Sequence, residues 1–310
     1  MGLLPLTTKG KKQKHITMIA SKAVPLCYPW CSITITEGVM KKCKEILKDN
    51  EVLAFLIGTY VVSWLIWMPF VIFSQGWIKG LGSFGPTISA LLITGITKGR
   101  SGLKELFAKV LIWKVSLFWY VFSLFSTLGA ILLSLGIYRL AGGEVVNTND
   151  PGQWYLIPVI FLYVLFFSVA GEESGWRGFL LPRLQKKYNA FSSSLIIGLF
   201  WGFWHLPLFL IQGDFHAHIP FLLFILQDVA LAVILTWIYN NTRGSLLLVH
   251  LFHAASNATV GLLPILPMKA GDSLMPLYIT VVVLVLVALA IVIIYGPKTL
   301  TRTRAKITSS

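Results

Sequence analysis

Long apolar runs alternate with short polar connections along most of this chain. A bilayer core of about 30 Å needs roughly 20 apolar helical residues per crossing, so each long run predicts a transmembrane helix. Eight such segments are predicted, near residues 53–73, 82–97, 115–138, 154–180, 190–211, 219–239, 245–266 and 274–296. The pattern therefore predicts an all-α fold, a polytopic membrane helix bundle of about eight transmembrane helices.

The composition supports a membrane environment. Hydrophobic residues make up 56% of the 310 residues, charged residues only 12%, and the mean hydropathy is +0.76. Such a composition does not fit the surface of a soluble globule of this length. We therefore expect an integral, multi-pass membrane protein with the lipid bilayer as its surroundings.

The positions of the basic residues predict the topology. With the N-terminus inside, all but three of the 26 Lys and Arg residues fall in cytoplasmic connections, the exceptions being Lys79, Arg139 and Lys269. This is the positive-inside pattern, and it predicts that both termini are cytoplasmic. The net charge of +14 then reflects topology and attraction to anionic lipid, and we expect no nucleic-acid partner.

The ends of the chain differ from its middle. Residues 1–50 are expected to form a basic cytoplasmic tail, loose or disordered, or to reflect a start-site artefact, because the sequence from Met40 resembles an ordinary N-terminus. A membrane domain is predicted over 51–297 and a second basic cytoplasmic tail over 298–310. The three cysteines lie in the first tail, on the reducing side, and no disulfide framework is expected. They are Cys27, Cys31 and Cys43.

Residues 100–113 have an amphipathic pattern instead of a fully apolar one. Apolar side chains recur at helical spacing, with Lys104, Glu105 and Lys109 opposite them. The pattern predicts a helix that lies along the cytoplasmic interface.

Several polar side chains fall inside the predicted spans. An ionisable group in a span costs roughly 2.5–3.5 kcal/mol even on the gentler scales and is by default a candidate for function. These residues are Glu172, Glu173, Arg177, His205, Asp228, His250, His253 and Asn257.

The stretch GEESGWRG contains three of these groups. Glu173 and Arg177 are four residues apart, so they can pair on one helix face. Glu172 is turned by about 100° from Glu173, away from that pair. Two interpretations stay open: a structural salt bridge at the end of a span with Glu172 solvated, or a general base at Glu172. Three glycines in this stretch also predict close approach of another helix or of substrate backbone. They are Gly171, Gly175 and Gly178.

The other polar groups suggest hydrolysis. His253 and Asn257 are four apart and project from one face, and His205 lies on the fifth span. In one mechanism Glu172 and His205 polarise a water, while His253 and Asn257 stabilise the oxyanion. In the other, Glu172, His205 and His253 bind Zn²⁺, which activates the water. Both mechanisms hydrolyse a peptide bond.

Three motifs resemble those of a known family. GEESGWRGFLLPRL resembles the EExxxR motif of the type II CAAX prenyl endopeptidases and of the wider CPBP group of intramembrane proteases and bacteriocin-immunity proteins. WGFWHLPL resembles the FxxxH motif of that family and HAASN its HxxxN motif. The resemblance covers roughly residues 154–260, the expected catalytic core of a protease domain over 51–297.

The resemblance implies a role for each matching residue. Glu172 would activate water together with His205, and His253 and Asn257 would stabilise the oxyanion. Glu173 and Arg177 would support the site or orient the substrate terminus. Trp201 stands where the family has Phe, and we expect altered packing near His205 with no loss of chemistry.

The resemblance also implies an activity. It is endoproteolysis near the cytoplasmic membrane face, with C-terminal processing of prenylated CAAX proteins or other membrane-associated peptides. No cofactor is favoured, and zinc is the alternative. Two other functions stay open: a family member that acts on a bacteriocin or another membrane peptide or confers immunity, and an ion- or proton-coupled transporter.

Four residues outside the motifs also have expected roles. Asp228 is expected to bond with Gln227 or a neighbouring helix, and His216 and His218 are expected to be solvated in an outer loop. Pro207 should interrupt the fifth helix just after His205.

Overall fold

The structure is a computed structural model that describes residues 41–42, 44–73, 77–145 and 155–302. The chain divides into a unit at Met1–Cys43 and a larger unit at Lys44–Ser310, and everything below concerns the larger unit. Most of the predicted N-terminal tail, with its three cysteines, and the last part of the C-terminal tail lie outside the described residues.

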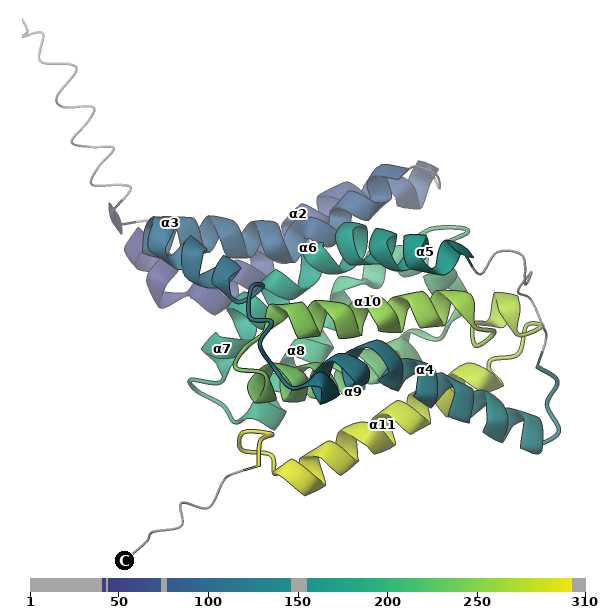
Figure 1. Cartoon of the computed structure of the whole chain (residues 1–310). Helices are drawn as coiled ribbons and strands as arrows, with labels where there is room; N and C mark the ends of the chain where they lie inside the picture. The colour runs from purple at the N-terminus through teal and green to yellow at the C-terminus, as the bar shows by residue number, and fades with distance from the viewer. Residues whose placement is uncertain (1–40, 43, 74–76, 146–154, 303–310) are drawn as a thin grey trace, which may run out of the picture. The chain divides into compact units, whose positions relative to one another are not determined.

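All regular structure in the described ranges is helical, as the sequence predicts (Figure 1). The longer α-helices are α2 (Glu51–Phe73), α3 (Gly85–Ala108), α4 (Leu117–Leu140), α8 (Ala190–Trp204), α9 (Phe221–Asn241), α10 (Leu246–Leu262) and α11 (Met275–Tyr295). The shorter ones are α5 (Ile157–Val164), α6 (Ala170–Glu173) and α7 (Leu181–Leu184). The 3₁₀ segments are η1 (Trp77–Phe84), η5 (Leu206–Leu210), η6 (Phe215–His218) and η7 (Pro267–Lys269), and the π-helical segments are η3 (Leu165–Val169) and η4 (Ser174–Leu180).

Within the described residues, seven helical stretches are long and apolar enough to cross a membrane. They are Glu51–Phe73, Lys79–Ala108, Leu117–Leu140, Ile157–Leu184, Ala190–Leu210, Phe221–Asn241 and Met275–Tyr295. The remaining predicted segment is α10, which is apolar but only 17 residues long, about 26 Å at 1.5 Å per residue. The protein is thus a multi-pass helical membrane protein.

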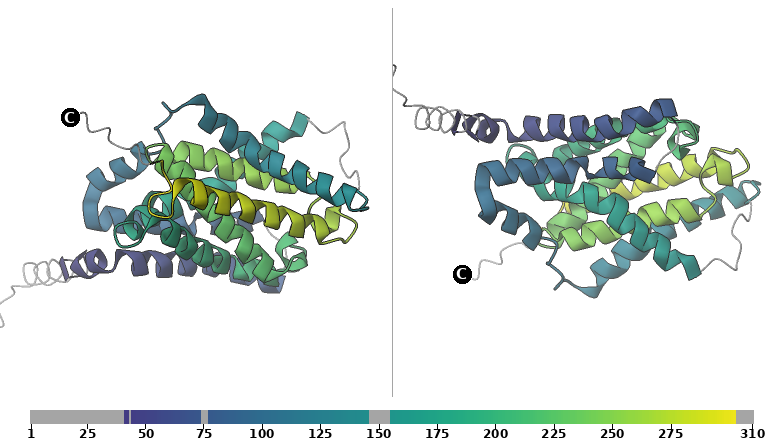
Figure 2. Two further views of the ribbon diagram at one scale, coloured as in Figure 1. Left: turned by 90° about the horizontal axis from the view of Figure 1, so that it is seen from below. Right: turned by 90° about the horizontal axis from the view of Figure 1, so that it is seen from above.

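The central helices are the most enclosed. In α9 every residue from 230 to 239 is buried. α10 lies between α5 and α4 (Figure 1), and α11 lies alongside α4 and α9 (Figure 2). The outer helices instead expose large apolar side chains such as Leu65 and Ile72 of α2, which is the surface expected to face hydrocarbon.

The stretch Ile157–Leu184, which contains GEESGWRG, is called the first-motif helix here. Two of its glycines bring it against α3 and the segment before α3. A Cβ on Gly171 would lie 2.5 Å from the carbonyl oxygen of Ser83, and one on Gly175 would lie 2.5 Å from the backbone carbon of Pro86. The prediction that these glycines permit close approach is confirmed, and the approaching groups are the backbone of η1 and of the start of α3.

The helix α3 bends sharply at Gly99, which has φ 64° and ψ −155°. A positive φ of this kind is readily adopted only by glycine. The part after the bend corresponds to the predicted amphipathic helix, and it ends at Ala108, five residues before the expected end. Leu106 on this part is buried, whereas Phe107 is half exposed.

The chain after α11 is hydrogen-bonded to two other helices. The backbone N–H groups of Ala190 and Phe191, at the start of α8, donate to the carbonyls of Lys298 and Pro297. The side chain of Asn241, at the end of α9, donates to the carbonyl of Leu300, which is itself fully buried. These contacts hold the end of α11, the start of α8 and the end of α9 at one end of the bundle.

Candidate active site

The two glutamates and the arginine of the first motif lie where the helix changes its winding. Glu172 and Glu173 end α6, and Arg177 lies in the π-helical segment η4 that follows. All three are buried, with exposed fractions of 3%, 0% and 0%. Isolated π-helical turns are frequent at functional sites because they shift side chains out of the ordinary helical register. The interpretation of Glu172 as a solvated surface carboxylate is therefore wrong.

Glu173 joins the first and third motifs. Its Oε1 accepts a 2.7 Å hydrogen bond from Arg177 Nη1, which confirms the predicted pairing four residues apart. The same oxygen accepts a 2.7 Å hydrogen bond from His253 Nδ1 on α10. Because a carboxylate ion-paired to Arg can only accept, His253 must donate from Nδ1. Glu173 thereby fixes the ring of His253.

Glu172 is held by Trp201 of α8. The indole Nε1–H donates to Glu172 Oε2 over 2.8 Å, and the Arg177 guanidinium lies 4.4 Å from the centre of the Trp201 ring. Trp201 packs near His205, as expected, and it also makes a hydrogen bond that a Phe at this position has no N–H to donate. The departure from the family motif thus supplies a hydrogen bond to the candidate catalytic carboxylate.

His205 caps the C-terminal end of α8. That helix ends at Trp204, and a 3₁₀ segment containing Pro207 follows, as predicted for a proline at this position. The ring Nδ1 lies 2.9 Å from the carbonyl oxygen of Trp201, and a carbonyl can only accept, so Nδ1 donates. In the neutral ring Nε2 is then an acceptor.

The two remaining residues of α10 differ in their surroundings. Asn257 is partly buried one turn after His253, as the spacing predicts. His250 Nδ1 donates to the carbonyl oxygen of Leu246 over 2.6 Å, within its own helix. We therefore interpret His250 as a structural residue, because its ring bonds to the backbone of its own helix.

Asp228 of α9 lies beside this cluster, where the sequence analysis did not place it. Its Oδ2 is 3.6 Å from His205 Nδ1, and among the described residues it has no hydrogen-bond donor. This oxygen therefore does not make the expected hydrogen bond to Gln227 or to a neighbouring helix. A spacing rule could not have found the pair, because His205 and Asp228 are on different helices and outside any common motif.

The loop between η5 and α9 contains a buried ion network. Asp214 accepts from Lys79 of η1 and, over 2.6 Å, from His216 Nδ1. Burial would raise the pKa of Asp214, but the hydrogen bonds from His216 and Lys79 outweigh it and lower the pKa well below the usual range. Burial lowers the pKa of His216 below 6.5 despite its contact with Asp214. The expectation of a solvated His216 is wrong, whereas His218 is exposed as expected.

Lys109, just after α3, is hydrogen-bonded to the C-terminal part of the first-motif helix. Its Nζ donates to the carbonyl oxygen of Gly178 in η4 over 2.9 Å. Burial, and then the nearby charges of Arg183 and Lys98, lower the pKa of Lys109 to about 8. This lysine therefore holds η4 against the end of α3.

The described residues contain no group of three or more His, Cys, Asp or Glu side chains arranged to hold a metal ion. Glu172, His205 and His253, the alternative zinc ligands, are instead engaged with Trp201 and Glu173 through Oε2 and the two Nδ1 atoms.

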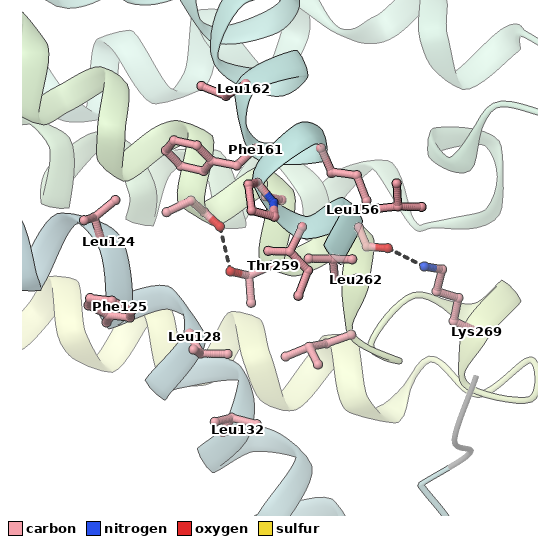
Figure 3. Close-up of a pocket in the computed structure, with 17 residues that line it drawn as sticks. Leu124, Phe125, Leu128, Leu132, Leu156, Phe161, Leu162, Thr259, Leu262 and Lys269 are labelled. Atoms are coloured by element: carbon pink, nitrogen blue, oxygen red, sulfur yellow. Dashed lines mark hydrogen bonds between the residues drawn. The ribbon is translucent and has the colours of Figure 1, made fainter. Parts of the chain in front are cut away.

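A cavity of about 950 Å³ opens between α4, α5 and α10 (Figure 3). Its walls are almost entirely apolar, with Leu128, Phe161 and Leu262 among them and Lys269 at one end. Of the residues of α10 that line it, Ala255, Ala258 and Leu262 are turned by about 140–180° from His253 at 100° per residue. No residue of the carboxylate and histidine cluster lines this cavity.

A membrane helix bundle that buries glutamates, histidines and an arginine in mutual contact has the groups required for general acid–base chemistry. The fold and site thus define a multi-pass membrane protein with a buried cluster of acid–base side chains. Comparison with known proteins specifies the class further.

Residues 153–259 match the family model described as type II CAAX prenyl endopeptidase Rce1-like. Over 237 residues the chain is 28% identical to CAAX prenyl protease 2 of Methanococcus maripaludis, covering 70% of this chain and 86% of that protein. Residues 153–259 are thus similar to an Rce1-like type II CAAX prenyl endopeptidase domain, and both comparisons indicate a membrane protease. All three motifs lie inside the matched residues.

Proposed function

We propose that this endopeptidase cleaves prenylated proteins that end in a CAAX sequence, removing the three residues after the modified cysteine. The names of the matching family and of the relative support this substrate class. The structural observation that carries the proposal is the buried Glu172 carboxylate, held by Trp201 next to the Glu173–His253 pair.

Glu172 and His205 activate the water in this proposal. A water between them donates its two O–H groups, one to the Glu172 carboxylate and one to His205 Nε2. Its lone pair then faces the carbonyl carbon of the scissile bond. As the C–O bond forms, one of the two acceptors takes the water proton and later delivers it to the departing amine nitrogen when the C–N bond breaks.

His253 and Asn257 stabilise the oxyanion. His253 already donates from Nδ1 to Glu173, so it must also be protonated at Nε2 to donate to the oxyanion. The charge of Glu173, in direct contact, stabilises that doubly protonated ring. The Asn257 amide supplies a second donor one turn later on α10.

Arg177 orients the site in this proposal. Its guanidinium is fully buried, contacts Glu173 and stacks on Trp201, so it connects the two side chains that hold His253 and Glu172. These contacts favour a supporting role over contact with the substrate terminus.

The cut takes place near the cytoplasmic face, with both termini on that side. The basic connections at the ends of α3, α7 and α9 support this orientation. A single cysteine introduced at the exposed Lys187 and one at the exposed Asp272, in a chain whose own cysteines are replaced, test it by labelling of sealed vesicles. Labelling of position 187 only after the cytoplasmic side is opened would agree; the opposite pattern would reverse the topology.

The activity is tested with the full chain in detergent and a fluorogenic farnesylated CAAX peptide. Wild-type protein should cleave it, and Glu172→Ala, His205→Ala and His253→Ala should each lose at least a hundredfold in rate, the usual scale for acid–base and oxyanion groups. His218→Ala is the matched control, because this histidine is exposed and outside the site. Cleavage that persists in all three variants would refute the site assignment.

The same assay separates the alternatives. Unchanged cleavage in a zinc chelator supports the glutamate mechanism, and complete inhibition that added zinc restores supports the metal mechanism. Efficient cleavage of peptides without a prenyl group would favour another membrane-peptide client. Ion flux in liposomes without any cleavage would favour the transporter.

A further inference from the structure

Asp228 is a buried carboxylate that the three motifs do not use. It lies in α9, where its neighbours other than Gln227 are apolar, and its exposed fraction is 2%. Burying a charge in a membrane helix is costly, so such residues usually have a function.

Two glycines of α8 bring Asp228 to the site. A Cβ on Gly198 would lie 2.5 Å from Val229 Cα, and one on Gly202 would lie 3.0 Å from Ile225 Cγ1. Ile225 and Val229 precede and follow Asp228 on α9, so the two backbones are closest at its level. The side chain of Asp228 is therefore held against the end of α8, where His205 lies.

The contact with His205 is electrostatic and is not a hydrogen bond. The 3.6 Å between Asp228 Oδ2 and His205 Nδ1 exceeds hydrogen-bonding distance, and Nδ1 already donates to Trp201. No described residue donates a hydrogen bond to Oδ2. Asp228 Oδ2 thus faces the imidazole of His205 without a hydrogen bond between them.

Charged groups from the other packed elements also act near this pair. Burial and the Glu172 carboxylate oppose a negative charge on Asp228, whereas the Arg177 guanidinium favours it. His216, whose ring centre lies 5.6 Å from that of His205, also acts on His205, as do Asp214 and His253. In this set, Asp228 is the carboxylate in contact with the His205 ring.

We propose that Asp228 is a positioning residue whose negative charge stabilises the positive charge on His205 when the ring takes a proton from the attacking water. The inference rests on the proposed function. The proton moves from water to His205 Nε2 and then to the leaving amine, and Asp228 takes no part in the transfer. An Asp beside a catalytic imidazole has this effect in the serine-protease triad, where it stabilises the imidazolium without being protonated.

The test is a double-mutant cycle on the full chain in detergent, with the farnesylated CAAX peptide as substrate. Asp228→Asn should lower kcat by about tenfold to a hundredfold, part of what a positioned base contributes, with KM within about twofold of wild type. In a His205→Ala background, Asp228→Asn should have no further effect, because its effect passes through His205. Asp272→Asn, on an exposed aspartate, is the matched control and should leave kcat unchanged.

An equal loss in the His205→Ala background would overturn the proposal, since Asp228 would then act on another group. The thermal unfolding midpoint gives a readout that does not need activity. Asp228→Asn should leave it unchanged or raise it, because Oδ2 accepts no hydrogen bond and a buried charge is removed. A clear fall would show a structural role and overturn the proposal, whereas absence of wild-type cleavage would refute the proposed function alone.

Discussion

Trp201 shows how one residue changes the environment of the candidate catalytic glutamate. In the family motif this position is Phe, which contributes only an aromatic face. Here the indole N–H reaches Glu172, and the ring also stacks under Arg177. The substitution that looks conservative in sequence therefore adds a donor to the most important carboxylate of the site.

Replacing Trp201 with Phe should lower kcat by about tenfold to a hundredfold. A hydrogen bond to a charged group is worth about 1.5–3 kcal/mol, and 1.36 kcal/mol corresponds to tenfold. Trp237→Phe is the matched control, because the Trp237 indole N–H is buried and has no acceptor among the described residues. Peptide-cleavage kinetics measure both, and an equal effect of the two substitutions would contradict the role of this hydrogen bond.

Glu173 is the counter-charge of a fully buried arginine. Glu173→Gln should destabilise the protein by about 3–5 kcal/mol, because the buried Arg177 would lose the carboxylate that forms its ion pair. Thermal unfolding in detergent measures this loss. The exposed Glu144→Gln is the control and should leave the midpoint unchanged. A Glu173→Gln midpoint close to that of the control would show that the pair does not stabilise the fold.

The residue contacts were predictable only within one helix. The Glu173–Arg177 pair follows from their spacing of four. The bond between Glu173 and His253 joins residues 80 positions apart, and no periodicity connects two helices at that separation. The bond from Trp201 to Glu172 was missed for the same reason, because it depends on how α8 packs against α6.

At the scale of elements, the first-motif helix is a special case among the spans. It combines two π-helical segments with glycines that touch η1 and α3, so its position is set by backbone contact instead of side-chain packing. Since Glu172 and Glu173 lie between Gly171 and Gly175, any shift of this helix moves both carboxylates.

Gly175→Ala should therefore cost about 1–3 kcal/mol of stability, the usual cost of overpacking, and should lower kcat as well. The added methyl would overlap the backbone of Pro86, which cannot rotate away. Gly129→Ala on α4 is the matched control: its Cβ would meet nothing within 4 Å, and it should be neutral or stabilise by about 1 kcal/mol. Thermal unfolding midpoints and kcat values of both variants test this prediction. A Gly175→Ala protein with the wild-type midpoint and kcat would show that close backbone contact at Gly175 is not required.

The elements themselves were largely predictable, because long apolar runs have few other solutions in a bilayer. The bend at Gly99 and the π-helical turns around Glu172 were not, since local sequence gives no signal for them. Pro207 did indicate the end of α8 correctly.

At the scale of the whole unit, the Lys79–Asp214–His216 network connects η1 with the loop before α9, and it should make stability depend on pH. The pKa of His216 is below 6.5 in the folded protein, so between about pH 7 and 5 the unfolded chain binds a proton that the folded chain does not. Stability should therefore fall as the pH decreases. The lowered pKa of Asp214 adds to the loss only below its ordinary value of 3.8.

Thermal midpoints of wild type, His216→Gln and His218→Gln between pH 7.5 and 5 test this. The His216 variant should lose part of the pH dependence, and the exposed His218 variant should keep all of it. Equal pH dependence in all three proteins would show that His216 does not contribute to it.

The central claim is that Glu172 drives cleavage of a prenylated CAAX substrate at one bond. Its most direct test is the intact mass of the products from a farnesylated CAAX peptide incubated with wild type or Glu172→Ala. With wild type we expect a product that ends in farnesyl-cysteine and is shorter by three residues, together with a released tripeptide. With Glu172→Ala we expect uncut peptide. Cleavage at another bond, or the same products from Glu172→Ala, would contradict the central claim.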